Sequence, residues 1–313
     1  MAKWKILLTD GLEENGQELL RASAEVESNP TITADDLLKV VGTYDALIVR
    51  GRTKVTPAVF EAGGKLKVVG RAGVGVDNID LAAAKAKGVT VVNSPIATTL
   101  AVAELTLGLM LSLMREIPRA DAGMKATKWL KKELEGGELN LKTLGIIGCG
   151  RIGAAVGDRA RAFGMHVIGY DPLLTDSDIR RKGIEPASLD GIYQRADMIT
   201  IHVPLNDQTR GMINAETLGK MKKGVYLVCA ARGGVIDEAA LLAALESGQV
   251  AGAALDVFVT EPPGESTLAA HPKVIATPHI GAQTHEAQAR AAGDIASEVL
   301  AALNNEPLRW KVA

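Results

Sequence analysis

The chain has 313 residues, of which 47% are hydrophobic and 23% are charged, and its formal net charge is −2 at pH 7. This length is enough for about two domains, each with a core of its own. A nearly neutral chain has no general attraction for nucleic acid or for an anionic membrane, so we expect neither as a partner. Any anion that it binds must be held by a local cluster of cations.

The two cysteines, Cys149 and Cys229, are too few for a disulfide scaffold in a chain of this size. They form no CxxC motif and no Cys/His cluster with metal-ligand spacing, so no metal site is expected. We interpret both as small apolar core side chains beside predicted strand ends. The apolar run at residues 4–8 is too short for a signal peptide, and the longest one, residues 100–114, is too short for a membrane span. We therefore expect a reduced protein of the cytoplasm.

The first 92 residues alternate short apolar runs with helical segments, which is typical of a parallel sheet covered on both faces. The expected strands are residues 4–8, 24–27, 46–50, 66–70 and 89–92. The expected helices are residues 17–23, 33–41, 57–62 and 78–87. Thr33 begins one of these helices as an N-cap residue, and Gly88 ends another.

Residues 99–116 predict one long helix with apolar residues around most of its circumference. A helix of that kind is buried. It either crosses the interior between two domains or packs against another subunit, and a role in both is favoured. We therefore expect a homodimer.

Residues 144–171 have the layout of a dinucleotide site. An apolar strand at 144–147 leads into Gly148-x-Gly150-x-x-Gly153 and a helix that Gly164 ends; a second strand, 165–170, then closes on Asp171. Gly148 allows a tight turn, Gly150 lets the backbone approach a pyrophosphate, and Gly153 lets helix and strand pack closely. The N–H groups at the helix start would face the phosphates.

Asp171 follows Gly153 by 18 residues and ends the second strand of this unit. A carboxylate at this point can accept hydrogen bonds from the adenosine ribose and would repel a 2′-phosphate. Pro172 follows it, where an NADP site would favour an Arg. The cofactor is therefore expected to be NAD.

The rest of the chain continues the alternation of strands and helices. The expected strands are residues 198–203, 224–229, 252–257 and 274–276. The expected helices are residues 179–182, 189–195, 237–246 and 284–303. In an open α/β sheet the ligands bind at the carboxyl ends of the strands, so the residues just after each strand are the candidates for a site.

Three of these strand ends carry charged or titratable groups. Arg232 precedes two glycines, Asp256 and Glu261 follow one strand, and His279 follows another. An Arg can grip a carboxylate and polarise the adjoining carbonyl, while a His held by a Glu can transfer the proton of a 2-hydroxy acid. Spacing alone leaves the alternatives open: Arg232 as a structural ion pair, and His279 as a satisfied core histidine.

Taken in order, the motifs Arg232-Gly-Gly, Asp256-Val-Phe-x-x-Glu261-Pro and Thr277-Pro-His279-Ile-Gly resemble the D-isomer-specific 2-hydroxyacid dehydrogenases. The similarity covers essentially the whole chain. It implies an enzyme in which Arg232, Glu261 and His279 are catalytic and hydride passes between the substrate C2 and the nicotinamide C4.

The resemblance also implies a set of cofactor contacts. Arg151 and Ile152 would contact the pyrophosphate, Asp256 the nicotinamide carboxamide, and Thr99 the region of the nicotinamide. The complete expected set is Thr99, Gly148, Gly150, Arg151, Ile152, Gly153, Asp171, Ala230, Asp256 and Gly281.

The fold implied by the resemblance is α/β with two doubly wound parallel-sheet domains. A flavodoxin-like substrate domain would comprise residues 1–95 and 286–313, and a Rossmann NAD-binding domain residues 96–285, including the 99–116 helix. Catalysis would take place in the cleft between them.

Two N-terminal motifs, residues 49–56 and 70–80, resemble most closely the branch of the family that acts on D-3-phosphoglycerate. They contain Arg50, Arg52, Lys54 and Arg71, four cations after neighbouring strand ends, and such a cluster could hold a phosphate. Arg52 and Lys54 can also be read as solvated loop charges. The candidate substrate-binding residues are Arg50, Arg71, Val74 and Gly75, and the expected substrate is a phosphorylated 2-hydroxy acid.

Some features depart from that branch. Cys229 stands where the family usually has Asn, and Val74 and Val203 replace hydroxyl residues near the cofactor. The chain ends at Ala313 without the regulatory domain of the long forms, so feedback by serine is not expected. A glyoxylate or hydroxypyruvate reductase, or another D-2-hydroxyacid dehydrogenase, is the alternative, and a dinucleotide-sensing scaffold like the corepressors of this architecture is a remote one.

Overall fold

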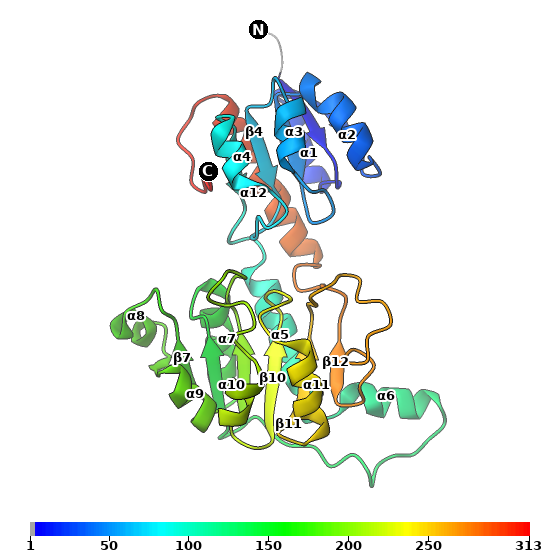
Figure 1. The fold of residues 1–313 in the computed structure, drawn as a ribbon, viewed down its shortest axis with the longest axis vertical. Helices are drawn as coiled ribbons and strands as arrows, with labels where there is room; N and C mark the ends of the chain where they lie inside the picture. The colour runs from blue at the N-terminus through cyan, green and yellow to red at the C-terminus, as the bar shows by residue number, and fades with distance from the viewer. Residues whose placement is uncertain (1–3) are drawn as a thin grey trace. The chain divides into compact units, whose positions relative to one another are not determined.

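The computed structural model describes residues 4–313, and the chain divides into two compact units. Unit 1 comprises Met1–Thr98 and Ala282–Ala313, and unit 2 comprises Thr99–Gly281. Each unit is a parallel sheet with helices on both faces (Figure 1). Among the described residues no helix is both long enough and apolar enough to cross a membrane.

Unit 1 has a five-stranded parallel sheet with the order β2-β1-β3-β4-β5. This is the flavodoxin-like order, in which the chain reverses its direction of travel across the sheet between β1 and β3. The strands are β1 Trp4–Leu8, β2 Ala24–Ser28, β3 Ala46–Val49, β4 Val68–Arg71 and β5 Thr90–Asn93. The helices are α1 Glu14–Arg21, α2 Ala34–Val40, α3 Pro57–Ala62, α4 Leu81–Ala86 and α12 His285–Leu303, with a 3-10 turn at Val41–Thr43.

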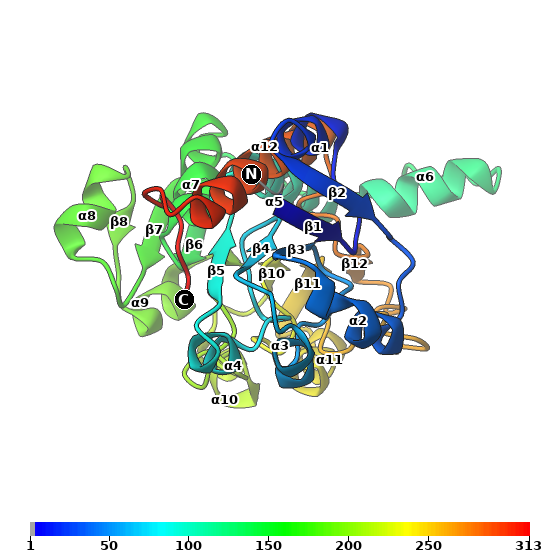
Figure 2. The same ribbon diagram turned by 90° about the horizontal axis from the view of Figure 1, so that it is seen from above.

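Successive residues of β3 point to opposite faces of this sheet, because side chains alternate along a strand. Leu47 and Val49 pack into the core under α2, α3 and α4. Ala46 and Ile48 pack into the core under α1 and α12, and these two helices lie side by side (Figure 2). The sheet is therefore buried on both faces, as its continuous apolar runs predicted.

The last residues of the chain are tied to α12 and to β5. Glu298 on α12 is buried, and its carboxylate accepts hydrogen bonds from Arg309 Nε at 2.8 Å and from the backbone N–H of Trp310 at 3.1 Å. Lys311 then forms an antiparallel bridge with Val92 of β5. This tail covers an edge of the unit 1 sheet.

Unit 2 has a seven-stranded parallel sheet with the order β12-β11-β10-β9-β6-β7-β8. The sheet grows outward from β6 on both sides, which is the Rossmann order, so the predicted fold class is confirmed. The strands are β6 Thr143–Ile147, β7 His166–Tyr170, β8 Glu185–Pro186, β9 Met198–Ile201, β10 Val225–Cys229, β11 Val250–Leu255 and β12 Val274–Ala276. The helices are α5 Thr99–Met114, α6 Ile117–Lys125, α7 Arg151–Ala162, α8 Asp176–Arg181, α9 Leu189–Arg195, α10 Ala215–Lys220 and α11 Glu238–Glu246.

The prediction of one helix over residues 99–116 was wrong at its end. Helix α5 stops at Met114, Glu116 adopts a left-handed conformation with φ +48°, and a separate helix, α6, begins at Ile117. Pro118 in the first turn of α6 explains the break, because a proline inside a continuing helix would remove a hydrogen bond and clash with the turn before it. The apolar side chains of α5 are buried mainly within unit 2, where this helix packs against α7.

Three elements were not predicted and several bounds differ. Helices α6 and α10 and the short strand β8 had no counterpart in the sequence prediction. The helix expected over 78–87 begins only at Leu81, because Asp80 is its N-cap and accepts a hydrogen bond from Ala83 N at 2.8 Å. The strand expected over 198–203 ends at Ile201.

Candidate active site

The loop between β6 and α7 is shaped by its three glycines. A Cβ at Gly148, where φ is +96°, would lie 2.5 Å from the carbonyl oxygen of His202, and one at Gly153 would lie 2.0 Å from the carbonyl oxygen of Gly148. A Cβ at Gly150 would meet nothing within 4 Å. Gly148 and Gly153 are thus required by packing inside the protein, while the backbone at Gly150 is open to a ligand.

Asp171 lies beside this loop, just after β7. Its Oδ2 accepts a hydrogen bond from the backbone N–H of Cys149 at 2.9 Å, and its Oδ1 accepts one from Leu173 N at 2.9 Å. Each carboxylate oxygen has a second lone pair, so both can still accept from a ribose hydroxyl. The carboxylate therefore ties the glycine loop to the end of β7 and keeps capacity for a sugar.

Two buried polar atoms near this edge of the sheet have no hydrogen-bond partner among residues 4–313. They are Oγ1 of Thr99, the first residue of α5, and Nδ1 of His202, just after β9. The other ring nitrogen of His202 is hydrogen-bonded to Thr200 Oγ1 at 2.9 Å, and burial lowers the pKa of His202 to about 4. Buried polar groups are normally paired, so an unpaired hydroxyl and an open glycine turn fit a site completed by a bound dinucleotide.

The cysteines are part of the core, as the sequence predicted. Both are buried and unbridged, and Cys149 Sγ would lie 2.5 Å from a Cβ at Gly169. Burial raises the pKa of the Cys149 thiol to about 12, so the thiolate is absent at neutral pH. Neither sulfur is available for chemistry.

Arg232, Glu261 and His279 follow three strands that are neighbours in the sheet. Arg232 comes after β10, Glu261 after β11, and His279 after β12, and these strands lie in the order β12-β11-β10. A Cβ at Gly233 would lie 1.8 Å from the carbonyl oxygen of Phe258, so the glycine lets the Arg232 loop pack directly against the loop that carries Glu261. The fold therefore brings together the three groups that are separate in the sequence.

Glu261 and His279 form a hydrogen-bonded pair. Glu261 Oε2 lies 2.7 Å from His279 Nδ1, and Glu261 Oε1 accepts from the backbone N–H of Phe258 at 3.1 Å. The His279 side chain is 49% exposed, and the backbone at His279 is left-handed with φ +53°. Because Nδ1 donates to the carboxylate, Nε2 is the nitrogen left to exchange a proton with a ligand. The alternative of a satisfied core histidine is excluded by this exposure.

Asp256 holds the loop that carries His279. Its carboxylate is 1% exposed and accepts from Thr277 Oγ1 at 2.6 Å, Ile280 N at 2.8 Å and Gly281 N at 2.8 Å. Three donors from one loop fix the left-handed turn at His279. The resemblance implied that Asp256 contacts the nicotinamide carboxamide. The structure shows that it also holds the His279 loop, which the sequence did not indicate.

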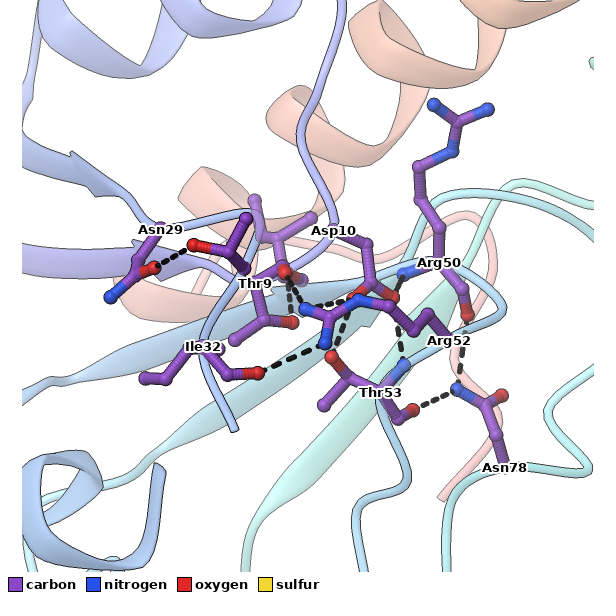
Figure 3. Close-up of polar contacts among 10 residues, drawn as sticks. Thr9, Asp10, Asn29, Ile32, Arg50, Arg52, Thr53 and Asn78 are labelled. Atoms are coloured by element: carbon purple, nitrogen blue, oxygen red, sulfur yellow. Dashed lines mark hydrogen bonds and ion pairs between the residues drawn. The ribbon is translucent and has the colours of Figure 1, made fainter. Parts of the chain in front are cut away.

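In unit 1 the candidate cations differ in the contacts that their side chains make. Arg52 donates to the carbonyl oxygens of Ile32 and Thr9 and lies 3.2 Å from Asp10 Oδ1 (Figure 3). The alternative that Arg52 is merely a solvated loop charge does not hold, because its side chain, although 49% exposed, is tied to Thr9, Ile32 and Asp10. Lys54 is exposed and forms no ion pair within residues 4–313.

The Arg50 guanidinium points away from that network in Figure 3. It donates from Nη2 to Gln288 Oε1 and makes no ion pair within the described part of the chain. Arg71 lies at the end of β4 and donates from Nη1 to the carbonyl oxygen of Ala72 at 3.2 Å. Val74 and Gly75 follow in the next turn, where the Val74 carbonyl accepts from Asn93 Nδ2 at 2.6 Å.

Comparison with known proteins identifies the family. The family model described as "D-isomer specific 2-hydroxyacid dehydrogenase, NAD binding domain" matches residues 107–281. The chain belongs to this family. Unit 2 contains the matched residues, so its open glycine loop and Asp171 lie in an NAD-binding domain.

Among curated relatives, D-3-phosphoglycerate dehydrogenase from Bacillus subtilis is 48% identical over 299 residues, which are 95% of this chain and 56% of that protein. The chain thus spans about half the length of the curated relatives it matches. A glyoxylate reductase from Paecilomyes thermophila has a similar structure, with a TM-score of 0.92, 31% identity, and coverage of 100% of this chain and 99% of that one. A D-lactate dehydrogenase from Aquifex aeolicus, solved with NAD and lactic acid, has a TM-score of 0.86, 32% identity and 96% coverage of both chains.

Sequence reasoning missed several polar residues that lie beside the candidate residues within each unit. Asp10 follows β1 and His202 follows β9, so the rule that pointed to Arg232 and His279 would also have found them. Asn78 and Gln288 carry no such signal, because each acts through hydrogen bonds to residues distant in sequence.

Proposed function

We propose that this chain carries out the NAD-dependent oxidation of D-3-phosphoglycerate to 3-phosphohydroxypyruvate, the first step of L-serine biosynthesis. The observation that supports the reaction type best is the Glu261–His279 pair, held beside the Arg232 loop in an NAD-binding domain. The substrate is supported by the likeness to D-3-phosphoglycerate dehydrogenases and by the Arg50 guanidinium, which donates to Gln288 and makes no ion pair among residues 4–313.

His279 is the proposed acid and base. In the oxidation its Nε2 takes the proton of the substrate 2-hydroxyl, while the Glu261 carboxylate stabilises the imidazolium through Nδ1–H. In the reverse direction the same Nε2–H returns the proton to the carbonyl oxygen. Bound NAD supplies the hydride acceptor.

Arg232 is the proposed carboxylate-binding group. A guanidinium donates two parallel N–H bonds to a carboxylate, and a third N–H can polarise the neighbouring C2 oxygen. Gly233 lets this loop pack against the loop that carries Glu261, and Gly234 adopts φ +84° in the turn that follows Arg232.

The proposed cofactor residues are those of the glycine loop and its surroundings. The backbone from Gly148 to Gly153, with Arg151 and Ile152, would hold the pyrophosphate, and Asp171 the ribose. Ala230, Asp256 and Gly281, at strand ends of the same sheet, and Thr99, with its unpaired hydroxyl, would surround the nicotinamide. In unit 1, Arg50 and Arg71 would bind the phosphate, and Val74 and Gly75 would line the substrate site.

A glyoxylate or hydroxypyruvate reductase is the second candidate. It is favoured by the structural likeness to a glyoxylate reductase over 99% of that chain. The catalytic residues would be the same, and the difference would lie in the use of Arg50 and Arg71.

The decisive experiment compares 3-phosphohydroxypyruvate, hydroxypyruvate and glyoxylate as substrates for NADH oxidation by the purified protein. A kcat/KM for the phosphorylated acid at least about tenfold above the others, or about 1.4 kcal/mol of differential binding, is expected. A preference for the smaller acids would transfer the assignment to the reductase.

We also propose that the protein is a homodimer. The apolar side chains of α5 are mostly buried within unit 2, so this helix no longer argues for a partner. Helix α6 and the loop after it instead project from unit 2 (Figures 1 and 2), with Ile117 and Met124 exposed and Trp129 76% exposed. Light scattering should find a dimer for the wild type and for the control Leu19→Glu, and a monomer for Met124→Glu with Trp129→Glu; a wild-type monomer contradicts the proposal.

A further inference from the structure

The loop that carries Arg50 is held from both sides by two side chains. Asp10 Oδ2 accepts the backbone N–H of Arg50 at 2.7 Å and that of Thr53 at 3.1 Å. Asn78 Nδ2 donates to the carbonyl oxygens of the same two residues, at 3.0 Å for Arg50 and 2.7 Å for Thr53. Figure 3 shows these four hydrogen bonds around one turn of backbone.

The Asp10 carboxylate is fully engaged in this arrangement. Its side chain is 4% exposed, and its Oδ1 also accepts from Thr53 Oγ1 and lies 3.2 Å from Arg52 Nη2. Arg52 in turn holds Thr9 and Ile32, so the carboxylate is connected to the ends of β1 and β2. A buried charge with this number of donors fixes its neighbours strongly, because releasing any one of them would leave buried charge unpaired.

The side chain of Arg50 is held at its far end as well. Gln288 on α12 accepts from Arg50 Nη2 and donates from Nε2 to the carbonyl oxygen of Ala282 at 2.6 Å. A long arginine side chain ordinarily loses rotamer freedom when it binds an anion. The backbone N–H, the backbone C=O and the guanidinium of Arg50 are each held by a hydrogen bond. Part of the entropy that Arg50 would lose on binding an anion is therefore already lost in the free protein.

We propose that Asp10 and Asn78 are positioning residues that act through Arg50, fixing its guanidinium for recognition of the substrate anion. This inference rests on the proposed function, because it takes Arg50 to be a substrate-binding residue. Neither side chain has to touch the substrate, so their effect depends on the presence of the Arg50 side chain.

The test is a double-mutant cycle on kcat/KM, measured with 3-phosphohydroxypyruvate and with hydroxypyruvate. Asp10→Asn keeps the shape of the side chain but turns one acceptor oxygen into a donor. It should lower kcat/KM about tenfold for the phosphorylated acid in the wild-type background, mostly through KM, and less than about twofold when Arg50 is already alanine. An equal loss in both backgrounds would overturn the proposal, and so would an Arg50→Ala variant that binds every acid as well as the wild type.

Thr53 provides a second pair of variants in case Asp10→Asn does not fold. Thr53→Val removes the hydroxyl that donates to Asp10, while Thr53→Ser keeps it, so only the valine variant should raise KM. Asp45→Asn is the matched control. Asp45 precedes the same strand β3 at its other end and accepts the backbone N–H of Lys5 at 3.0 Å, so its loss should affect stability without affecting KM.

Failure of this inference is distinguishable from failure of the proposed function. If the wild type shows no preference for the phosphorylated acid, the assignment to D-3-phosphoglycerate fails. The cycle is then read on the acid that the enzyme uses best, and coupling between Asp10 and Arg50 still decides whether Asp10 acts through Arg50.

Discussion

The two units have the same architecture but use the equivalent crevice in opposite ways. In unit 1 the strand order reverses between β1 and β3, and in unit 2 between β6 and β9. Such a reversal opens a crevice at the carboxyl ends of the strands, where ligands bind. In unit 2 the glycine loop leaves this crevice open at Gly150, whereas in unit 1 the Asp10 carboxylate fills it and binds the loop after β3.

Topology alone therefore does not make a nucleotide site. A carboxylate at the unit 1 crevice would repel a pyrophosphate, and its hydrogen-bonding capacity is used by Arg50, Arg52 and Thr53. In unit 1 the backbone N–H groups of Arg50 and Thr53 are satisfied by the Asp10 carboxylate and so do not face an anion. Whether each crevice is open to a ligand depends on the few residues after the first strand of its unit.

The largest expected effect separates the proposed chemistry of unit 2 from the binding of NADH by the same unit. His279→Ala should lower kcat about 10²- to 10⁴-fold, because the proton has no acceptor, while the Kd for NADH changes less than about twofold. Steady-state kinetics and NADH fluorescence titration measure the two quantities. His166→Ala, an exposed histidine at the amino end of β7, is the control, and a His279→Ala enzyme with a tenth of normal kcat would rule out the acid–base role.

The second prediction distinguishes Gly153, which is packed against the protein, from Gly150, which is open to a ligand. Gly153→Ala places a Cβ 2.0 Å from Gly148 O and should lower the free energy of unfolding by about 1–3 kcal/mol. Gly150→Ala meets no atom within 4 Å, so it should change stability by less than about 0.5 kcal/mol but weaken NADH binding. Urea unfolding and NADH titration of both variants test this, and equal destabilisation by the two alanines would contradict the open crevice.

The third prediction concerns the histidine at the wall of the unit 2 crevice. Burial lowers the pKa of His202 to about 4, below the value of about 6.5 expected in the unfolded chain. The unfolded state therefore binds more protons between these values, so stability is lost as the pH falls from about 6.5 to about 4.

Between pH 7.5 and pH 5.0 this loss should amount to roughly 2 kcal/mol. Urea unfolding at the two pH values should show a smaller pH effect, by that amount, in His202→Asn than in the wild type. The exposed His166→Asn should behave like the wild type. An unchanged pH dependence in His202→Asn would show that its imidazole is not held neutral by burial.

The smallest expected effect compares the carboxylates of the two crevices. Asp171→Ala should reduce the preference for NADH over NADPH about tenfold or more, because a carboxylate repels the 2′-phosphate. Asp10→Asn should leave this ratio unchanged, because the Asp10 carboxylate is bonded to the Arg50 loop of unit 1. The ratio of kcat/KM for the two cofactors measures the effect, and an unchanged ratio in Asp171→Ala would place ribose recognition elsewhere.

Much of the fold could be predicted because its signals are local. Continuous apolar runs marked the buried strands, and Gly148, Gly150 and Gly153 with Asp171 marked the second unit. Helix α6 was missed because Pro118 and its polar neighbours obscure the helical period. The short helix α10 has one buried residue, Leu218, which is too little for a periodic signal.

The charged groups of the candidate site could be proposed from the sequence, but the residues that hold them in place could not. Arg232, Glu261 and His279 could be found because each follows a strand. The contacts of the Arg52 guanidinium, and the hydrogen bonds by which Asp10 and Asn78 hold the Arg50 loop, depend on which backbone atoms come close after folding. Sequence spacing carries no information on such long-range pairs, so it could not show that Arg52 of the four-cation cluster is tied to Thr9 and Ile32 while the Arg50 guanidinium is bonded to Gln288.

The discontinuous composition of unit 1 has a consequence for biosynthesis. Unit 2 is a continuous segment, so it can fold while the ribosome is still translating, whereas the face of the unit 1 sheet under α12 is uncovered until residues 285–313 emerge. At roughly 5–20 residues per second, the interval between the end of β5 and the start of α12 lasts roughly 10–40 s. During that time the apolar face formed by Ile6, Leu8, Ile48, Val68 and Val92 is exposed to water, so nascent chains of this protein should depend on a chaperone.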